Sequence, residues 1–371
     1  MNNLHGILLA YRSDPALREL THHRNTCSVP IGGRYRIIDF MLSNLVNAGV
    51  SDVGLIVNES YQSLLDHVGS GKDWDLNRKN GGLRILPPFS YANTPAGGAN
   101  RGRMDALVDV RSYLVKIRQD YVVLAWGDIV ANLPIDKAFE QHLKTGADIT
   151  AICTGTPTGE PSVCTYFTVG ANGTVTDVAV HPTQPMGCET LECYILSKEL
   201  LLNLVDYAAA RRIHSFSEGI LLAMADQLKI IPYLFDGYVA RIHSVASYFA
   251  HSMELLDPAV QAELFDLDRP IRTKIHSLPA TYYSAEACSH GSLIADGCIV
   301  EGTVENSILF RGVKVEKGAR VANCILMQNT TVKEGATLSH AITDKNVVIN
   351  PGRMLMGHGN YPLAIEKNSV V

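Results

Sequence analysis

Short apolar runs alternate with segments of helical periodicity over the first two thirds of the chain. The apolar runs have the length of buried strands and lie at residues 6–9, 53–57, 121–125, 148–153, 192–195 and 229–234. Amphipathic helices are predicted between them at residues 40–48, 105–116 and 199–209. This alternation predicts an α/β domain whose mostly parallel sheet is covered by helices on both faces. Ligands of such sheets bind beyond the carboxyl ends of the strands, where Asp128 falls.

The pattern changes after about residue 278, where helical periodicity stops and short β-branched triplets recur between glycine turns. Gly318, Gly335 and Gly352 are 17 residues apart, close to three hexapeptides, which is typical of a parallel β-helix. A small antiparallel sandwich is the alternative for strands this short. In the β-helix, the residues expected to point inward are Ile294, Val300, Val315, Val321, Val332, Leu338 and Val348.

Composition and charge narrow the class of protein. A chain of 371 residues that is 46% hydrophobic can bury a large core in two domains. The net charge of −5, without a long run of lysine or arginine, gives no reason to expect a nucleic-acid or membrane partner. The apolar stretch at residues 4–10 is too short to span a bilayer and lacks a basic leader, so we expect a cytoplasmic protein.

The cysteines and histidines show no metal-ligand spacing. Eight cysteines are scattered without a C-x-x-C pair, and we expect buried free thiols rather than disulfides or a zinc site. The pair His22-His23 is expected to lie on the surface, because no partner stands at ligand spacing. Because the chain has no long basic run, any anion site must be a local pocket.

A dense motif near the amino terminus resembles a known family. Leu20-Thr21, Arg24, the run from Gly32 to Phe40 (GGRYRIIDF) and Leu42-Ser43-Asn44 are together similar to glucose-1-phosphate adenylyltransferase. The segments 269–273 (RPIRT) and 278–280 (LPA) resemble the connector of that family, so the resemblance covers nearly the whole chain. It implies a Rossmann-like nucleotidyltransferase domain at residues 1–255, a connector at 256–278 and a left-handed parallel β-helix at 279–371.

The reaction of that family joins ATP to glucose 1-phosphate, giving ADP-glucose and diphosphate. A glycine loop cradles the phosphates, two aspartates hold Mg²⁺, and basic side chains position the anions. In this chain the loop glycines fall on Tyr11-Arg12 and Asp14, whose Cβ atoms obstruct a tight cradle. By the same resemblance, the catalytic arginine is replaced by Ala16, and the lysine expected after Arg24 is replaced by Thr26.

The metal and sugar positions are altered as well. Asp128 keeps one metal position, whereas the second aspartate falls on Arg241, and two cations a few ångströms apart repel by roughly 4 kcal/mol at an effective dielectric of 20. The sugar-binding motifs of the family fall on residues around His181 and Ser215 and lack their lysines. Gly102 and Asp105 survive from a nucleotide-contacting segment, although either could simply serve the fold.

The resemblance therefore implies a non-catalytic regulatory subunit that joins an active adenylyltransferase subunit in a cytoplasmic heterotetramer for glycogen biosynthesis. Mg²⁺ would be used by the active partner, and we expect no metal or other cofactor on this chain. The allosteric effector arginines of the family match Arg24 and Arg36, which could hold a sugar-phosphate effector; the alternative is that Arg36 merely pairs with Asp39 or a neighbouring carboxylate. Two other functions stay open, a weak nucleotidyltransferase with altered metal use and a stand-alone sugar-phosphate or nucleotide-binding protein.

Overall fold

The structure is a computed structural model that describes residues 3–10, 15–57, 60–87 and 102–371. The chain forms two compact units. Unit 1 comprises Met1–Tyr11, Phe40–Glu59 and Val68–Arg241, and unit 2 comprises Arg12–Asp39, Ser60–His67 and Ile242–Val371. Each unit is described by itself below.

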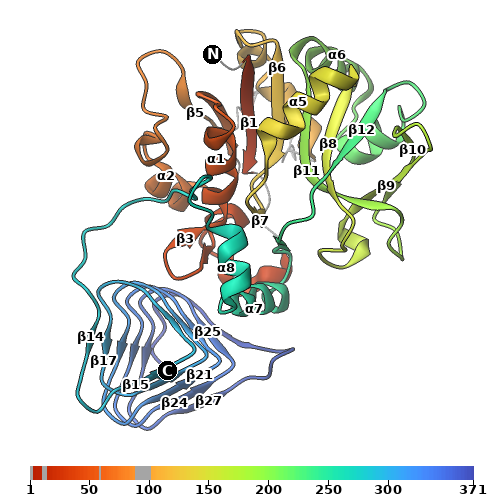
Figure 1. Cartoon of the computed structure of the whole chain (residues 1–371). Helices are drawn as coiled ribbons and strands as arrows, with labels where there is room; N and C mark the ends of the chain where they lie inside the picture. Colours follow the sequence, from red (N-terminus) through yellow and green to blue (C-terminus); the bar gives the residue numbers. More distant parts are fainter. Residues whose placement is uncertain (1–2, 11–14, 58–59, 88–101) are drawn as a thin grey trace. The chain divides into compact units, whose positions relative to one another are not determined.

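Unit 1 is built on a mixed nine-stranded sheet (Figure 1). Its main path runs β10-β9-β11-β6-β1-β4-β5, and β8 joins β11 to β12. The block β5-β4-β1-β6 is parallel throughout, whereas β11 runs antiparallel to its neighbours. The bounds are β1 Leu4–Ala10, β4 Asp52–Val57, β5 Gly82–Leu86, β6 Tyr121–Trp126, β8 Ile149–Thr154, β9 Thr165–Val169, β10 Val175–Val180, β11 Cys188–Ser197 and β12 Ile230–Leu234.

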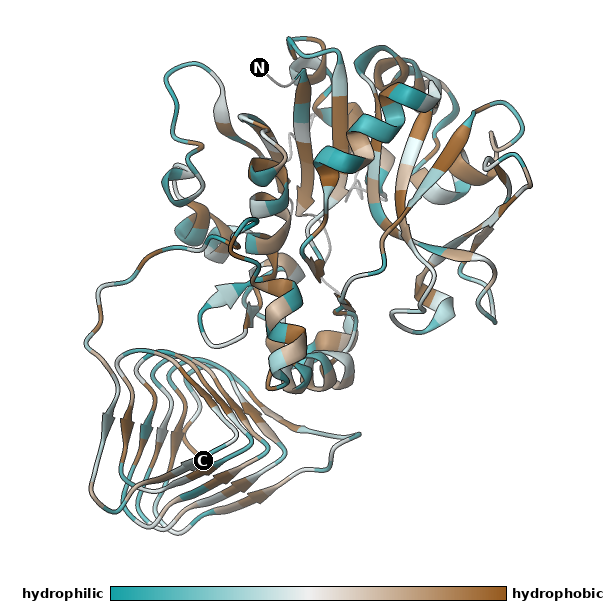
Figure 2. Ribbon diagram, in the orientation of Figure 1, coloured by the Kyte–Doolittle hydropathy of each residue, from teal (hydrophilic) through white to brown (hydrophobic). Residues whose placement is uncertain are grey.

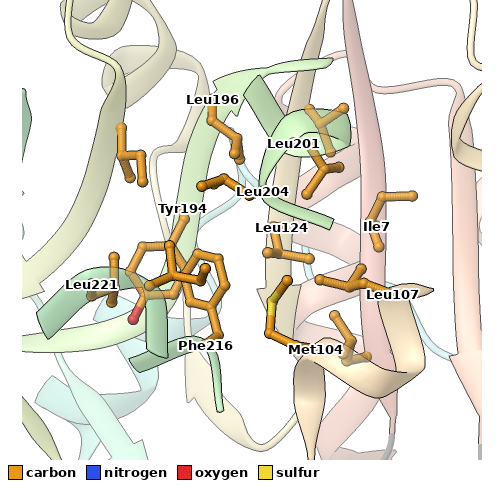
Figure 3. Packing of buried hydrophobic residues seen from close by; sticks show 14 of the residues in the cluster. Ile7, Met104, Leu107, Leu124, Tyr194, Leu196, Leu201, Leu204, Phe216 and Leu221 are labelled. Carbon is orange, nitrogen blue, oxygen red and sulfur yellow. The ribbon is translucent and has the colours of Figure 1, made fainter. Parts of the chain in front are cut away.

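The helices of unit 1 bury their apolar stripes on this sheet. A hydrophobic core packs α3 and α6 against β1, β6 and β11, with Leu107, Leu124, Tyr194, Leu201 and Phe216 at close quarters (Figure 3). The strands are hydrophobic along their length, whereas α5 turns a hydrophilic face outward (Figure 2). These helices are α3 Arg103–Asp109, α4 Arg111–Leu114, α5 Ile135–Thr145 and α6 Lys198–Arg211, while α1 Ile37–Asn47 begins in unit 2.

The carboxyl-terminal part of unit 2 is a parallel β-helix. Three five-stranded parallel sheets form its walls, which excludes the antiparallel sandwich. The sheets are β14-β17-β20-β23-β26 from Tyr282–Tyr283 to Val348–Ile349, β15-β18-β21-β24-β27 from Cys288–His290 to Met354–Met356, and β16-β19-β22-β25-β28 from Leu293–Ile294 to Leu363–Ile365.

The 17-residue repeat predicts the coil geometry well. Gly318, Gly335 and Gly352 all have φ near +70°, the left-handed region that favours glycine at turns. The expected inward residues between Val300 and Leu338 are buried. Val348 is an exception, because it is only half-buried while its neighbours Val347 and Ile349 fill the core; side chains alternate along a strand, so the expected register was one residue off.

Two segments near the amino terminus pack in unit 2 with two helices that precede the β-helix. They contain η1 Pro15–Leu20, η2 Thr26–Ser28, the hairpin β2 Pro30–Ile31 and β3 Tyr35–Arg36, and α2 Gln62–Val68; the two helices are α7 Val245–Glu254 and α8 Pro258–Leu264. The Tyr248 hydroxyl on α7 donates to the Pro30 carbonyl over 2.7 Å. None of the helices in the described ranges is long and apolar enough to cross a membrane.

The cysteines are mostly buried free thiols and the histidine pair lies at the surface, as the sequence predicts. All eight cysteines are free, and seven are buried while Cys288 is exposed. His22 and His23 are about half exposed and both contact the Glu366 carboxylate, at 3.1 and 3.3 Å.

Candidate functional site

The site in unit 1 lies at the carboxyl end of β6, as the sequence predicts for Asp128. Asp128 follows β6 after Gly127, and the short strand β7 (Ile129–Ala131) continues from it. β13 (Val239–Arg241) pairs antiparallel with β7, with Arg241 opposite Ile129. This pairing brings Arg241 to the neighbourhood of Asp128, where the resemblance places the two metal aspartates.

Arg241 forms a buried ion pair that sequence reasoning did not identify. Its guanidinium lies 3.1 Å from the Glu189 carboxylate, and its Nη2 donates to the Thr190 carbonyl over 2.8 Å. The exposed fractions of the two side chains are only 6% and 1%. Burial acts to lower the pKa of Arg241, but Glu189 and Asp128 are among the groups that more than offset it, so the pKa rises and the cation is permanent.

Glu189 is held by a dense set of donors. The Thr158 backbone N–H donates to it over 2.9 Å, the Thr158 hydroxyl donates to its other oxygen, and the Tyr166 hydroxyl donates over 3.2 Å. Glu189 stands just before a bulge in β11, where the pairing with β8 shifts between Thr190 and Cys193. Bulges re-aim side chains at sites, and this one has Glu192 in a left-handed backbone conformation (φ 52°).

The described residues do not fit a two-carboxylate Mg²⁺ site. Asp128 is buried, and its Oδ1 has no hydrogen-bond partner within the described part of the chain, so one carboxylate oxygen remains for a cation. The neighbouring side chain is not a second carboxylate but the Arg241 guanidinium, whose charge is balanced by Glu189. Across the described ranges, no three His, Cys, Asp or Glu side chains gather as metal ligands. We therefore derive no step through Mg²⁺ on this chain.

Aromatic side chains fill the space beside Asp128. Trp126, the last residue of β6, packs edge-on against Tyr194 at 5.5 Å and lies 5.9 Å from Phe216. The Arg103 guanidinium stacks over Trp126 at 4.7 Å and pairs with the Glu192 carboxylate. The indole is buried and the Arg103 guanidinium is already engaged by Trp126 and Glu192, so this pair offers no free group to a ligand.

The two sugar-site positions serve local backbone structure. His181 is exposed, takes a left-handed φ of 52°, and its N–H donates to the Cys164 carbonyl over 2.9 Å. The Ser215 hydroxyl accepts the Glu218 N–H over 3.1 Å and so caps the π-helical turn Ser217–Leu222. Neither side chain presents a cation to a sugar phosphate.

Gly102 and Asp105 both secure the loop at residue 214. A Cβ on Gly102 would lie 2.2 Å from the His214 carbonyl oxygen, so the close approach of two backbone segments requires glycine. The Asp105 carboxylate contacts Nδ1 of His214 at 2.9 Å. These contacts give both residues a role in the fold.

The altered loop positions fall partly outside the described residues. Tyr11, Arg12 and Asp14 are not described, whereas Ala16 is exposed in η1 and Thr26 is buried in η2. The Asn25 carboxamide caps η2 by accepting the Ser28 N–H over 3.1 Å. Thr26 therefore belongs to a packed turn and carries no charge.

The two effector candidates lie in unit 2. Nη2 of Arg24 donates to both carboxylate oxygens of Asp344, at 2.9 and 2.8 Å, Nη1 donates to the Leu20 carbonyl over 3.3 Å, and the side chains of Arg24 and Asp344 are nearly fully buried. The Arg36 guanidinium donates to the Ser63 carbonyl and, over 2.9 Å, to the Ser63 hydroxyl. Asp39 accepts the backbone N–H of Arg36 over 2.9 Å and contacts His67 at 2.6 Å. The Asp39 carboxylate also raises the pKa of Arg36 against the larger lowering by burial, so the two charged groups interact electrostatically while the guanidinium donates to Ser63.

Lys345 is a third cation near these arginines that sequence reasoning missed. Burial, followed by the charges of Arg36 and Arg24, lowers the pKa of Lys345 to about 7, and Asp344 opposes the shift. Burial likewise lowers the pKa of Arg36 to about 10, with Arg24 adding to the effect. This cluster (Arg24, Arg36, Lys345 and Asp344) gathers three cationic side chains with one carboxylate among its members, while Asp39 and Asp66 also act on Arg36; the lowered pKa of Lys345 shows that positive charge dominates around the lysine, where an anion would be stabilising. The lysine lies more than 300 residues from the arginines, so no local motif reveals it.

The fold and this site together define a nucleotidyltransferase-type α/β unit followed by a hexapeptide β-helix. Residues 6–253 match the nucleotidyl transferase family, and residues 279–359 match the family described as GlmU-like, C-terminal hexapeptide. These matches confirm the fold class expected from the sequence, including the β-helix.

Whole-chain relatives identify the group within this class. The chain is 34% identical over 321 residues to the glycogen biosynthesis protein GlgD of Bacillus subtilis, covering 86% of this chain and 83% of that protein. It is 36% identical over 320 residues to GlgD of Geobacillus stearothermophilus, covering 86% and 83%. It is 33% identical over 320 residues to the glucose-1-phosphate adenylyltransferase of Halalkalibacterium halodurans, covering 85% and 83%. The chain belongs to the glucose-1-phosphate adenylyltransferase family, as its motifs predict, and resembles the GlgD type within it.

Proposed function

We propose that this chain is a regulatory subunit of a glucose-1-phosphate adenylyltransferase, catalytically inactive or strongly impaired, that modulates an active partner subunit in glycogen biosynthesis. The observation that carries the proposal is the buried Arg241–Glu189 pair beside Asp128. It puts a permanent, neutralised cation at the position where the family has its second metal-binding aspartate. The partner would supply Mg²⁺ and the catalytic residues.

The chemistry explains why the loss would be severe. Transfer of an adenylyl group brings two anions together, and a metal ion and basic side chains must neutralise the charge that develops. By the resemblance, Ala16 stands where the family has its catalytic arginine and Thr26 where it has a lysine, and neither side chain can carry charge. The surrounding fold is intact, which suits a subunit whose role is to bind a partner.

The cationic cluster of unit 2 supports a regulatory role. Burial and then the charges of Arg36 and Arg24 lower the pKa of Lys345 to about 7, and a sugar-phosphate effector would offset the charge repulsion by adding negative charge. Arg36 offers the more accessible guanidinium, since Arg24 is committed to Asp344 in a bidentate pair. An effector bound here would couple to the partner only if the two assembled states bind it with different affinity.

Two measurements test the proposal against its alternatives. ADP-glucose synthesis from ATP, Mg²⁺ and glucose 1-phosphate by this chain alone should be undetectable or far below that of an active subunit. Turnover by the isolated chain at a comparable rate would establish the weak-enzyme alternative instead. The chain should also co-elute with an active subunit in size-exclusion chromatography after co-expression. Retention as a separate homo-oligomer would favour a stand-alone binding protein.

A further inference from the structure

A second charged pocket lies at the opposite edge of the sheet from Asp128. His5 stands near the start of β1, Asp52 is the first residue of β4, and Gly82 is the first residue of β5. These three strands are parallel neighbours, so their amino ends meet at one edge (Figure 1). Residues at this edge and on the segment after α4 line a pocket of about 350 Å³. From His5 to Ala10, β1 rises about 16 Å, which separates the pocket from the carboxyl-end site.

The lining is strongly basic. Lys79, Arg84, Lys116 and Arg118 border the pocket, and Asp52 is the single carboxylate among the lining residues. Four cations against one carboxylate leave a charge of about +3 in a chain whose net charge is −5. This concentration of positive charge is local and would draw a small anion.

The one carboxylate is already used to build the wall. Asp52 accepts the Gly82 N–H over 2.9 Å through Oδ1 and the Gln119 side-chain amide over 2.6 Å through Oδ2. A Cβ on Gly81 would lie 1.7 Å from Oδ1 of Asp52, and Gly81 has φ of +88°, which excludes other residues. Asp52 therefore fixes the loop, and its single charge offsets only one of the four cations.

The floor of the pocket is rigid and polar. The Tyr113 hydroxyl and Nε2 of His5 lie 3.0 Å apart, and a Cβ on Gly54 would lie 2.7 Å from the Tyr113 ring, so glycine makes room for the tyrosine. The Arg84 guanidinium stacks over that ring at 5.6 Å, which holds one cation toward the pocket. His5 is 4% exposed, and burial lowers its pKa to about 4, although Asp52 and a side-chain hydrogen bond with Gln119 oppose the shift. His5 is therefore a neutral part of the wall, and the four cations carry the attraction for an anion.

From this arrangement we infer that the pocket at the amino ends of β1, β4 and β5 binds a compact ligand carrying two phosphate groups. Four cations and one carboxylate around one cavity match the several negative charges of a diphosphate better than the smaller charge of a single phosphate. The ligand is either inorganic diphosphate or the diphosphate moiety of a nucleotide, and the two share the chemistry that the pocket recognises. This inference does not depend on the proposed regulatory function, because the pocket lies in unit 1 and the cationic cluster of unit 2 is a separate site.

Isothermal titration calorimetry with sodium diphosphate tests the inference on the full chain. The paired variant Arg84→Gln/Lys116→Gln removes two exposed cations of the pocket, and Lys137→Gln/Lys144→Gln removes two exposed cations of α5 as a matched control. We expect the pocket variant to weaken binding by about tenfold or more for each cation removed, while the control variant keeps the affinity of the original chain. A Lys345→Gln variant should also keep it, which separates this pocket from the cluster in unit 2.

Hydrogen exchange locates the bound anion independently. Diphosphate should slow amide exchange at residues 79–84 and 113–119, and ADP in place of diphosphate shows whether a nucleoside is accepted. Equal dissociation constants for the pocket and control variants would overturn the inference, as would protection confined to unit 2 or a titration without saturation. Superimposable thermal melts of the variants establish that a loss of binding is not a loss of fold.

Discussion

Breaking the Arg241–Glu189 pair should destabilise unit 1 by an amount that the geometry sets. Removing one partner of a buried ion pair leaves an uncompensated charge, at a typical cost of 3–5 kcal/mol. In an Arg241→Met variant, Glu189 would keep the hydrogen bonds donated by Thr158 and Tyr166. The loss of unfolding free energy should therefore lie near the lower end of this range. We expect each of Arg241→Met and Glu189→Gln to lower the free energy of unfolding by about 3 kcal/mol. The double variant should cost about 2 kcal/mol less than their sum, because no charge is then left buried.

Urea unfolding followed by tryptophan fluorescence measures this quantity in the right part of the molecule. The chain has two tryptophans, Trp74 and Trp126, and both belong to unit 1. The substitution Lys137→Met on the exposed face of α5 serves as a control that removes a cation without breaking a buried pair. Additive single-variant costs, with a coupling energy near zero, would refute the view that a paired cation occupies this site.

Three further predictions address other parts of the structure. Sulfate binding to the cationic cluster should weaken by up to about tenfold per pH unit above pH 7, because sulfate remains a dianion while Lys345, whose pKa is lowered to about 7, loses the proton it needs to bind the anion. In calorimetric titrations, the Lys345→Gln variant should bind sulfate with an affinity that no longer changes with pH. Arg24→Gln should destabilise unit 2 by about 3 kcal/mol or more, since it leaves the buried Asp344 carboxylate unpaired. Thermal melting followed by circular dichroism measures this loss, and a melting temperature equal to that of the original chain would contradict it. Gly102→Ala should cost about 1–3 kcal/mol because its methyl group meets the His214 carbonyl, and an unchanged urea midpoint would contradict this steric account.

The periodic parts of the chain are predictable because one physical rule governs each of them. Six predicted strands correspond to β1, β4, β6, β8, β11 and β12, since continuous apolar runs are what a sheet buried on both faces requires. The 17-residue repeat predicts the β-helix because each coil must turn where glycine is favoured. The predicted helix at 105–116 is in fact two, because Val110 leaves helical geometry (φ −95°, ψ 12°) between α3 and α4.

The site is less predictable because its contacts join residues that are distant in the sequence. The motif comparison places Arg241 beside Asp128 but does not reveal Glu189, which is 52 residues from Arg241 in the sequence. Glu189 pairs with Arg241 and so balances the charge of that cation. Lys345 lies 309 residues after Arg36, and its lowered pKa arises only from burial and neighbouring charge. Two glutamates, Glu189 and Glu192, in one short strand of mostly apolar residues are a signal the sequence did carry, because a buried carboxylate requires a partner.

The most direct test of the regulatory account is the initial rate of ADP-glucose formation by an active subunit, alone and co-purified with this chain, across a range of effector concentrations. The account predicts that the mixture differs from the active subunit alone, in maximal rate or in the effector concentration that gives half of the response. Both curves should be compared per active subunit, and Lys345→Gln in this chain should reduce the difference in effector response. Coincident curves with and without this chain would contradict the account.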